Sequence, residues 1–316
     1  MNEPKRPTPA GPATTVGMFA SLRYRKARDR VVEAVLLSCG LVAVFITLAI
    51  VAILVSESAV FFEHVSLKEF LTDPLWTPLF ADAHYGIMPL VAGTLTTTFV
   101  ALAVAIPFGT TIAIYLSEFA PHKVRESLKP ILELLGAVPT VVYGYFALLM
   151  VTPALQWFMP DLPGFNMLGP GLVIGVMIIP YVSSVAEDAM RSVPQNLREA
   201  SYGLGARRIT TSLKVVFPAA ISGIIAALIL ATSRAIGETM IVAVAAGAPQ
   251  ARTINPLDPG GTMTSAMVGL ATGSDQVTGN SAAFQSLFFV GLLLFLITLV
   301  LNVVGDAFVR RARQRY

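Results

Sequence analysis

Residues 284–309 read FQSLFFVGLLLFLITLVLNVVGDAFV, with Asp306 as the only charged residue. The hydrocarbon core of a bilayer is about 30 Å thick, and a helix needs about 20 apolar residues to cross it. This stretch therefore predicts a transmembrane helix. Five other apolar blocks reach the same length, at about residues 31–55, 88–116, 131–153, 170–190 and 219–247. Together the blocks predict a polytopic membrane protein with about six transmembrane helices.

The composition of the whole chain agrees with this prediction. Of its 316 residues, 55% are hydrophobic and 13% are charged, as is typical of membrane proteins. Hydrocarbon offers no water to backbone N–H and C=O groups, and the blocks lack strict alternation, so each block is expected to be helical rather than a barrel strand. The first block is also longer than the core of about 7–15 residues in a signal peptide. We expect an all-α fold with a retained first helix.

Lysine and arginine are distributed unevenly between the connecting segments. Of the 22 such residues, seven lie before the first block, three in residues 117–130, five in residues 187–218 and four after residue 309. The opposite side of a six-span topology has only Lys68 and Arg252. Because positive segments are retained in the cytoplasm, we expect a plasma (inner) membrane protein with both termini cytoplasmic. Topology and anionic lipid account for the basic residues, so the net charge of +3 requires no nucleic-acid partner.

The sequence also predicts how the chain is organised. Residues 1–17 are rich in Pro, Thr and Ala, which favours disorder. The aromatic residues within 56–87 suit a partly interfacial segment, and the Pro and Gly residues within 248–283 suggest an irregular outer loop. The expected segments are a basic, partly disordered cytoplasmic tail (1–30), a first transmembrane helix with its outer loop (31–87), a transmembrane core (88–309) and a basic cytoplasmic tail (310–316).

Within the core, residues 187–218, hereafter the basic loop, separate two apolar blocks. Its Pro and Gly residues divide it into short pieces, one of which is predicted to be a helical turn containing Leu197 to Tyr202. Ser192 or Asn196 is a suitable N-cap for this turn. We expect the short helix to lie at the membrane surface.

Glu199 is a lone acid among arginines in this predicted helix. An acid of this kind is ordinarily solvated, but its spacing from other residues favours a second interpretation. The loop contains, in order, Glu199-Ala200-Ser201, Gly205, Val215 and Phe217-Pro218. This pattern resembles the EAA loop of ATP-binding cassette (ABC) import permeases. It departs from that motif at Ser201, Val215 and Phe217, all conservatively in size or polarity.

The resemblance implies the architecture of type I ABC importer permeases. It also implies a coupling helix that docks in a cleft of a separate cytoplasmic ATPase, with Glu199, Ala200 and Gly205 at the contact. The sequence has no Gly-x-x-x-x-Gly-Lys-Ser/Thr loop, whose amides and lysine hold phosphates. ATP and Mg²⁺ are therefore expected in the partner ATPase, with no cofactor in this chain.

Nothing in the sequence indicates catalysis or metal binding. No Gly-x-Ser-x-Gly or His-Glu-x-x-His pattern occurs, and His64, His84 and His122 lie far apart. The single cysteine, Cys39, lies within an apolar block and can form no disulfide within the chain. We expect a conduit and not an enzyme.

Two charged residues interrupt the apolar block at 219–247. Arg234 and Glu238 stand four residues apart, so on a helix they would share one face and could pair there. A central arginine costs about 2.5–3.5 kcal/mol on insertion scales, so this face should point into the bundle or a wet cavity. One interpretation is a helix-packing ion pair. The other is an anion pathway, in which the guanidinium binds phosphate-type oxygens and Glu238 prevents permanent trapping of the anion.

The sequence around these residues narrows the resemblance. Residues 233–240 (SRAIGETM) and 135–145 (LGAVPTVVYGY) look like phosphate-specific permease subunits of bacterial ABC importers, more like the PstC type than its PstA companion. The likeness spans most of residues 88–309. It implies that Arg234 and Glu238 line the substrate pathway. It also implies a PstA-like related permease, a PstB-like cytoplasmic ATPase dimer and a PstS-like extracytoplasmic phosphate-binding protein as partners.

Two alternatives stay open. A permease for another oxyanion, such as sulfate or molybdate, would share the same loop, and a channel or scaffold that works without ATP belongs to a different class. The sequence sets neither the substrate affinity nor the division of selectivity between this chain and a binding protein.

Proline and glycine residues inside the apolar blocks predict where helices bend and where they pack closely. Pro139 and Pro180 remove backbone hydrogen bonds and are expected to bend their helices. Gly171 and Gly175 form a small-residue face that permits close approach of another helix. We interpret the two glycines as a packing feature.

Overall fold

The computed structural model describes residues 13–80, 82–248, 251–273 and 281–313. These residues form helices and loops, with two isolated β-bridges that join Leu75 to Ala251 and Trp76 to Tyr85. The predicted all-α fold is confirmed. Four helices are long and apolar enough to cross a membrane, and there are up to six spans if each of two bent helix pairs counts as one.

The unbroken spans are α1 (Ala13–His64), α3 (Met88–Ile114) with its π-helical extension η1 (Tyr115–Phe119), α7 (Leu168–Arg191) and α15 (Ser281–Arg313). The first bent pair comprises α4 (His122–Ala137), α5 (Thr140–Phe146), η2 (Ala147–Val151) and α6 (Thr152–Gln156). The second comprises α9 (Arg208–Thr211), η3 (Ser212–Val216), α10 (Phe217–Ala219) and α11 (Ile221–Ile236). The shorter helices are α2 (Leu67–Thr72), α8 (Gln195–Gly203), α12 (Met240–Ala245) and α13 (Met263–Thr272).

Apolar blocks and helices do not coincide where the chain bends. α4 meets the following helices at 85°, and Pro139 immediately precedes α5, so the bend predicted at this proline is confirmed. α7, in contrast, continues through Pro180 as one helix. The block at 219–247, predicted to be one helix, ends as α11 at Ile236 and restarts as α12 at Met240.

The chain divides into two compact units, Met1–Ile53 and Leu54–Tyr316. The described side chains of the first unit belong to α1 and are mostly apolar and exposed, Phe45 to 72%. An exposed apolar surface of this extent is typical of a helix that crosses a membrane. Residues 13–17, predicted to be disordered, are helical, while residues 1–12 lie outside the described residues.

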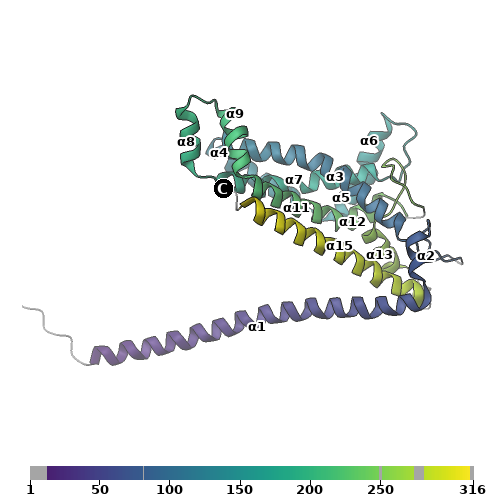
Figure 1. The fold of residues 1–316 in the computed structure, drawn as a ribbon, viewed down its shortest axis with the longest axis horizontal. Helices are drawn as coiled ribbons and strands as arrows, with labels where there is room; N and C mark the ends of the chain where they lie inside the picture. Colours follow the sequence, from purple (N-terminus) through teal and green to yellow (C-terminus); the bar gives the residue numbers. More distant parts are fainter. Residues whose placement is uncertain (1–12, 81, 249–250, 274–280, 314–316) are drawn as a thin grey trace, which may run out of the picture. The chain divides into compact units, whose positions relative to one another are not determined.

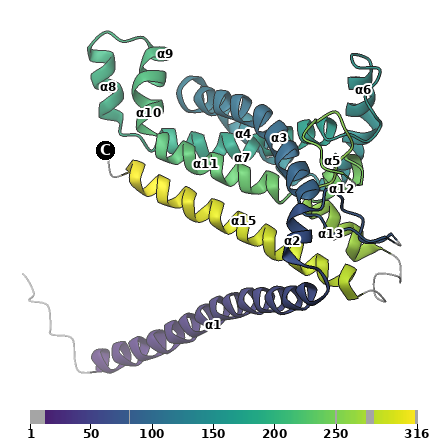
Figure 2. The ribbon, with the colours of Figure 1, turned by 45° about the vertical axis from the view of Figure 1, so that its right-hand side comes forward.

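The second unit is built around α3, α7 and α11. α3 packs most extensively on α7, which also packs on α11, and α15 lies along α11 (Figure 2). Glycines permit the close approach of α3 and α7. An added Cβ would lie 2.7 Å from Val100 at Gly171 and 2.8 Å from the Ala101 carbonyl oxygen at Gly175. The predicted small-residue face is therefore confirmed.

One end of this unit holds an aromatic cluster, made of Phe61, Phe62, Phe70, Trp76, Tyr85 and Phe289. Phe61 is completely buried and Phe70 is 2% exposed. These aromatic residues pack on one another and on Phe289 of α15, and their place at a membrane interface stays a prediction.

The segment 248–283 is also more regular than predicted. It contains α13, which begins at a reciprocal capping box between Thr262 and Ser265. Each side-chain hydroxyl accepts a hydrogen bond from the other residue's backbone N–H, which satisfies two donors at the start of the helix. A ten-residue helix therefore replaces part of the expected irregular loop.

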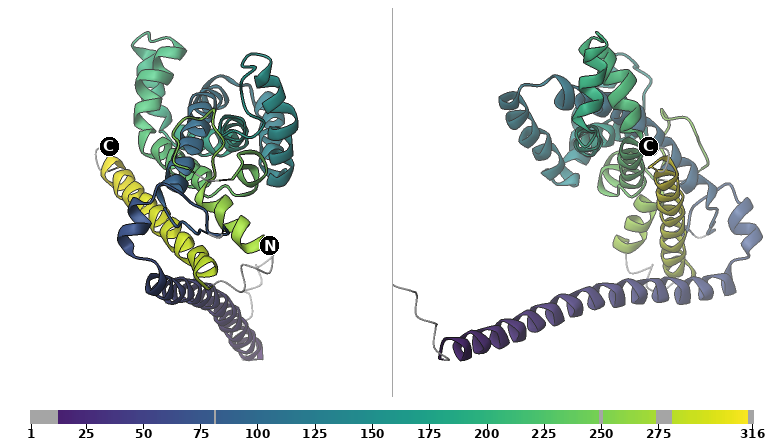
Figure 3. Two further views of the ribbon diagram at one scale, coloured as in Figure 1. Left: turned by 90° about the vertical axis from the view of Figure 1, so that its right-hand side faces the viewer. Right: turned by 60° about the vertical axis from the view of Figure 1, so that its left-hand side comes forward.

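The basic loop forms the opposite end. α8 and α9 stand together beyond the bundle, on the side away from α6 and α13 (Figure 1). They lie side by side in the other views as well (Figure 3). Beneath them, α7 and α11 meet in a small apolar cluster that includes Met190, Val193 and Ile224.

Three π-helical turns continue α-helices among the described residues. η1 extends α3, η2 extends α5 and η3 extends α9. Single π turns are rare in proteins and are frequent at functional sites. η3 lies within the basic loop, and η1 presents Glu118 to Arg198 of that loop.

Candidate functional site

The predicted short helix of the basic loop is confirmed as α8. It begins after Pro194, which provides no side-chain cap, so the predicted caps Ser192 and Asn196 are wrong. α8 ends at Gly203, and Gly205 then adopts a φ of +79°, a left-handed conformation that favours glycine.

Glu199, Ala200 and Gly205 are all exposed on this loop. Leu204, immediately before Gly205, is 90% exposed. The residues predicted to contact an ATPase therefore form one accessible surface of α8 and its C-terminal turn. Their role in the contact stays a prediction.

The residue before Glu199 has the opposite environment. Arg198 is 9% exposed and its guanidinium donates to four protein oxygens. Two belong to the Glu118 carboxylate, at 3.0 and 3.5 Å, and two are the backbone carbonyls of Met190 (2.8 Å) and Val193 (2.6 Å). Glu118 lies in η1 and its side chain is 4% exposed. A single arginine thus joins α8 to the ends of both α3 and α7.

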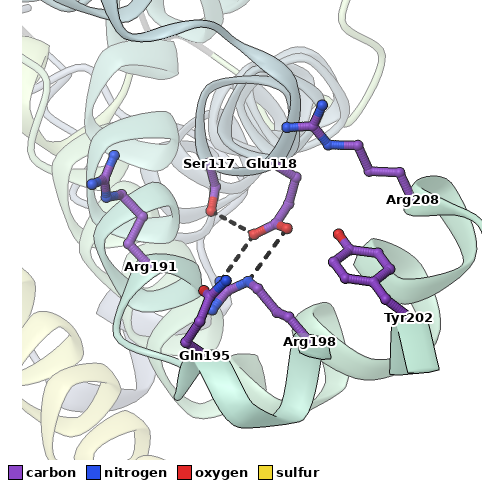
Figure 4. A pocket seen from close by; sticks show the side chains of 7 residues that line it. All are labelled: Ser117, Glu118, Arg191, Gln195, Arg198, Tyr202 and Arg208. Atoms are coloured by element: carbon purple, nitrogen blue, oxygen red, sulfur yellow. Dashed lines mark hydrogen bonds and ion pairs between the residues drawn. The ribbon is translucent and has the colours of Figure 1, made fainter. Parts of the chain in front are cut away.

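This ion pair forms one wall of an open cavity of about 540 Å³ (Figure 4). Ser117 donates to Glu118 at 2.9 Å, and the Tyr202 side chain lies on the α8 side. Arg191 and Arg208 stand on opposite sides of the pair, and the Arg208 guanidinium lies 5.3 Å from the centre of the Phe119 ring. The cavity therefore has more positive than negative side chains.

A second buried carboxylate ties α4 to α7. Glu187 is completely buried and contacts Arg125 at 2.5 Å and Lys129 at 3.4 Å. Lys129 also contacts the exposed Asp188 at 3.3 Å. The two buried carboxylates, Glu118 and Glu187, are thus each paired with a cationic side chain from another segment: Glu118 with one from α8 and Glu187 with two from α4.

Arg234 lies in the last turn of α11, and its side chain is exposed in the isolated chain. Its guanidinium lies 5.5 Å from the centre of the Tyr181 ring, a cation–π contact. Tyr181 also lines a cavity of about 380 Å³, together with Glu133, Gly136, Ala137, Pro180, Ser184 and Val185. No ion pair of Arg234 is present among the described residues. The guanidinium therefore keeps its hydrogen-bond donors for another partner.

Glu238 does not share a helix face with Arg234, because α11 ends between them. Glu238 is 5% exposed, and its carboxylate accepts the backbone N–H of Met240 at 3.2 Å. Its backbone carbonyl accepts the Thr264 hydroxyl at 2.7 Å. The expected pairing between the two charges is therefore not found, and the structure places Glu238 at the join between α11, α12 and α13.

The sequence analysis did not identify roles for three of these residues, Glu118, Glu187 and Tyr181. Glu118 and Glu187 each stand near the end of an apolar block, and an acid in that position was a usable signal for a buried ion pair. Tyr181 gave no such signal, because an aromatic residue in a span is ordinarily part of the core.

Comparison with known proteins gives a consistent result. Residues 105–316 match the family described as binding-protein-dependent transport system inner membrane component. The chain is 34% identical over 283 residues to the probable ABC transporter permease protein YqgH of Bacillus subtilis. The aligned region covers 89% of this chain and 91% of the relative. The chain is 32% identical over 260 residues to the phosphate transport system permease protein PstC of Pasteurella multocida, covering 76% and 79%.

Solved structures share the fold. A chain of a bacterial ABC transporter involved in the import of the acidic polysaccharide alginate is similar with a TM-score of 0.62 at 15% identity, covering 92% of this chain and 99% of that one. A chain of the inward-facing MetNI methionine ABC transporter is similar with a TM-score of 0.53 at 18% identity, covering 72% and 94%. The predicted type I ABC importer architecture is confirmed.

Proposed function

Because the chain belongs to the family of binding-protein-dependent transport system inner membrane components, it is the membrane-embedded permease subunit of an ABC importer, and we propose that its cargo is phosphate. The proposal is supported by relatives named as phosphate permeases, including PstC of Pasteurella multocida. It is carried by one observation. Arg234 presents a guanidinium at a break in a span, with an aromatic ring on one side and no carboxylate partner among the described residues.

A guanidinium in this setting suits a tetrahedral oxyanion. Its planar fork of donors matches phosphate oxygens, and its charge is permanent. Tyr181 holds the cation without neutralising it, so the attraction for an anion is retained. Glu238, directed toward the α12 end, supplies negative charge near the pathway that would limit how tightly an anion is held. Arg234 and Glu238 are thus proposed as pathway residues with separate and not paired roles.

The importer requires other subunits. A separate cytoplasmic ATPase dimer, PstB-like, would hold ATP and Mg²⁺ and bind the surface formed by Glu199, Ala200 and Gly205. A PstA-like permease would complete the pathway, and a PstS-like external protein would deliver phosphate. This arrangement places the basic loop and both termini in the cytoplasm, as the distribution of Lys and Arg predicts.

Anion uptake tests the proposal directly. The chain is purified in mild detergent with the subunits that accompany it, reconstituted in proteoliposomes, and supplied with radiolabelled phosphate or sulfate. ATP-dependent phosphate uptake that excess unlabelled sulfate does not reduce is expected. Sulfate uptake that is unaffected by phosphate would remove phosphate as the cargo, and uptake without ATP or without a bound ATPase would favour a channel.

A second cargo class has one observation in its favour. YqgH, which is similar to this chain over 89% of its length, is named as a probable ABC transporter permease without a substrate. Sulfate and molybdate present the same oxyanion geometry to a guanidinium. The competition experiment separates these anions from phosphate.

A further inference from the structure

We propose that the Arg198–Glu118 ion pair transmits the movement of α8 to the transmembrane helices, which makes both side chains positioning residues for transport. This inference rests on the proposed importer function and adds to it a specific mechanical connection. Arg198 lies one residue before the exposed Glu199, so the helix that faces the ATPase carries the connection on its opposite, buried side.

Arg198 gives α8 a side-chain attachment to two spans that it does not otherwise pack against extensively. The remaining packing of α8 is on α9 and η3, the start of the second bent pair, where Ser201 hydrogen-bonds Thr211 at 2.8 Å. Arg198 extends to Glu118 at the end of α3, by the ion pair drawn in Figure 4, and to two carbonyls at the end of α7. A displacement of α8 is therefore carried to α3 and α7 through one guanidinium.

Stability alone does not account for this ion pair. Burying two charges costs desolvation that their attraction roughly offsets, and apolar side chains of similar volume often serve equally well. Capping of α7 would need only the hydrogen bonds from Arg198 to Met190 and Val193. Glu118 adds a partner on α3, presented by a π-helical turn and oriented by Ser117. A directional, charge-assisted link between moving elements explains the additional group.

The connection continues toward the proposed pathway. α3 packs most extensively on α7, and α7 packs on α11, whose last turn carries Arg234. Tyr181 of α7 holds that arginine. Movement at the α8 end thus has a continuous packed route to the pathway, with Arg198 as its first step.

The test replaces the pair by apolar residues of similar size in the complete transporter. The double variant Glu118→Leu/Arg198→Met removes both charges at once and avoids leaving an unpaired buried ion. In proteoliposomes, the number of anions moved per ATP hydrolysed is expected to fall roughly tenfold, within the usual range of coupling between distant sites. ATPase binding is expected to persist, because Glu199, Ala200 and Gly205 are unchanged. Glu118→Gln is expected to lower the same ratio.

Asp306→Asn is the matched control, because it removes an arginine–carboxylate pair that is exposed on α15. It should retain the wild-type ratio. A double variant with the wild-type ratio, or one in which uptake and hydrolysis fall in proportion, would overturn the proposal, since the pair would then only support folding. The cargo is established with the wild type first. If that cargo is sulfate, the ratio is measured with sulfate, so the phosphate proposal can fail while the mechanical one is still tested.

Discussion

The basic loop and the α11–α12 break each contain one critical arginine, and the two differ in every contact. Arg198 is buried and donates to four protein oxygens, two of them from one carboxylate. Arg234 is exposed and contacts an aromatic face, with no carboxylate partner in the described part of the chain. A guanidinium with its donors satisfied holds protein segments together, whereas one with free donors can bind an anion. Sequence alone does not distinguish these two uses.

The largest expected effect concerns the satisfied arginine. Glu118→Ala leaves Arg198 buried without its counter-ion, which should reduce the free energy of unfolding by about 3–5 kcal/mol. Thermal unfolding in detergent measures the change. Asp306→Ala, which disrupts an exposed pair, should lower stability by less than about 1 kcal/mol. Equal losses from the two substitutions would remove the distinction between a buried and an exposed arginine pair.

The next effect concerns the free arginine. Arg234→Gln should reduce phosphate uptake by roughly 10- to 100-fold, since hydrogen bonds to a charged group contribute about 1.5–3 kcal/mol. Its unfolding temperature and ATPase binding should be unchanged, because no described ion pair is lost. Arg252→Gln, which removes another exposed guanidinium, is the control. Uptake at the normal rate by Arg234→Gln would contradict the anion pathway.

A smaller effect is expected at the turn that follows α8. Gly205→Ala forces a side chain into the left-handed region and should destabilise the turn by about 1–2 kcal/mol. Hydrogen exchange across α8 and α9 reports this change. Gly203→Ala is the matched control, because Gly203 is helical and a Cβ there meets nothing within 4 Å. Faster exchange is expected only in the Gly205 variant.

Tyr181 offers a milder change at the free arginine. Tyr181→Leu removes the ring beneath the guanidinium and should weaken phosphate uptake by roughly two- to fivefold, in line with a cation–π contribution of about 0.5–1 kcal/mol. Tyr181→Phe keeps the ring and should transport normally. If the two variants behave alike, the ring does not position Arg234.

His84 and Asp73 form a pair near the aromatic cluster, at the end of the unit opposite the basic loop. Its cation, unlike an arginine, can lose its charge as the pH rises. The pKa of His84 is raised above its ordinary value of 6.5, first by the hydrogen bond to Asp73 at 2.7 Å and then by the charges of Asp73 and Asp82, against an opposing effect of burial. The contribution of this pair to stability is fully present below pH 6.5, the ordinary pKa of histidine, and is lost as the pH rises through the raised pKa of His84.

Hydrogen-exchange protection of residues 73–80 and 82–86, corrected for intrinsic rates, should therefore be greater at about pH 6 than at about pH 8. The difference should be small, because 35% of the His84 side chain is exposed and solvent screens the interaction. In His84→Gln the protection should not depend on pH over this interval. A pH dependence that survives this substitution would assign the effect to another group.

The sequence predicted the features that depend on local pattern. The length of the apolar blocks indicated the all-α fold and about six spans, and the Pro and Gly residues of the basic loop indicated its short helix. These predictions succeeded because bilayer thickness and glycine geometry act on residues that are close in sequence.

The features that failed depend on contacts between distant residues. Arg198 and Glu118 are 80 positions apart, so their pairing has no local signal. The packing of the aromatic residues within 56–87 was not predicted, because their partner Phe289 lies far away in the sequence, on α15. The separation of Arg234 from Glu238 was missed because the spacing rule assumes one continuous helix, and α11 ends at Ile236.

The three π-helical turns have a consequence for the lineage of this chain. A π turn accommodates one more residue than an α turn while the helix continues in the same direction. Loss of one residue within 115–119, 147–151 or 212–216 would convert the turn to α-helix and leave the flanking spans in place. Single-residue gaps between aligned relatives are therefore expected at these turns, and a gap at 115–119 would turn the side chain of Glu118 relative to either the preceding or the following part of the helix.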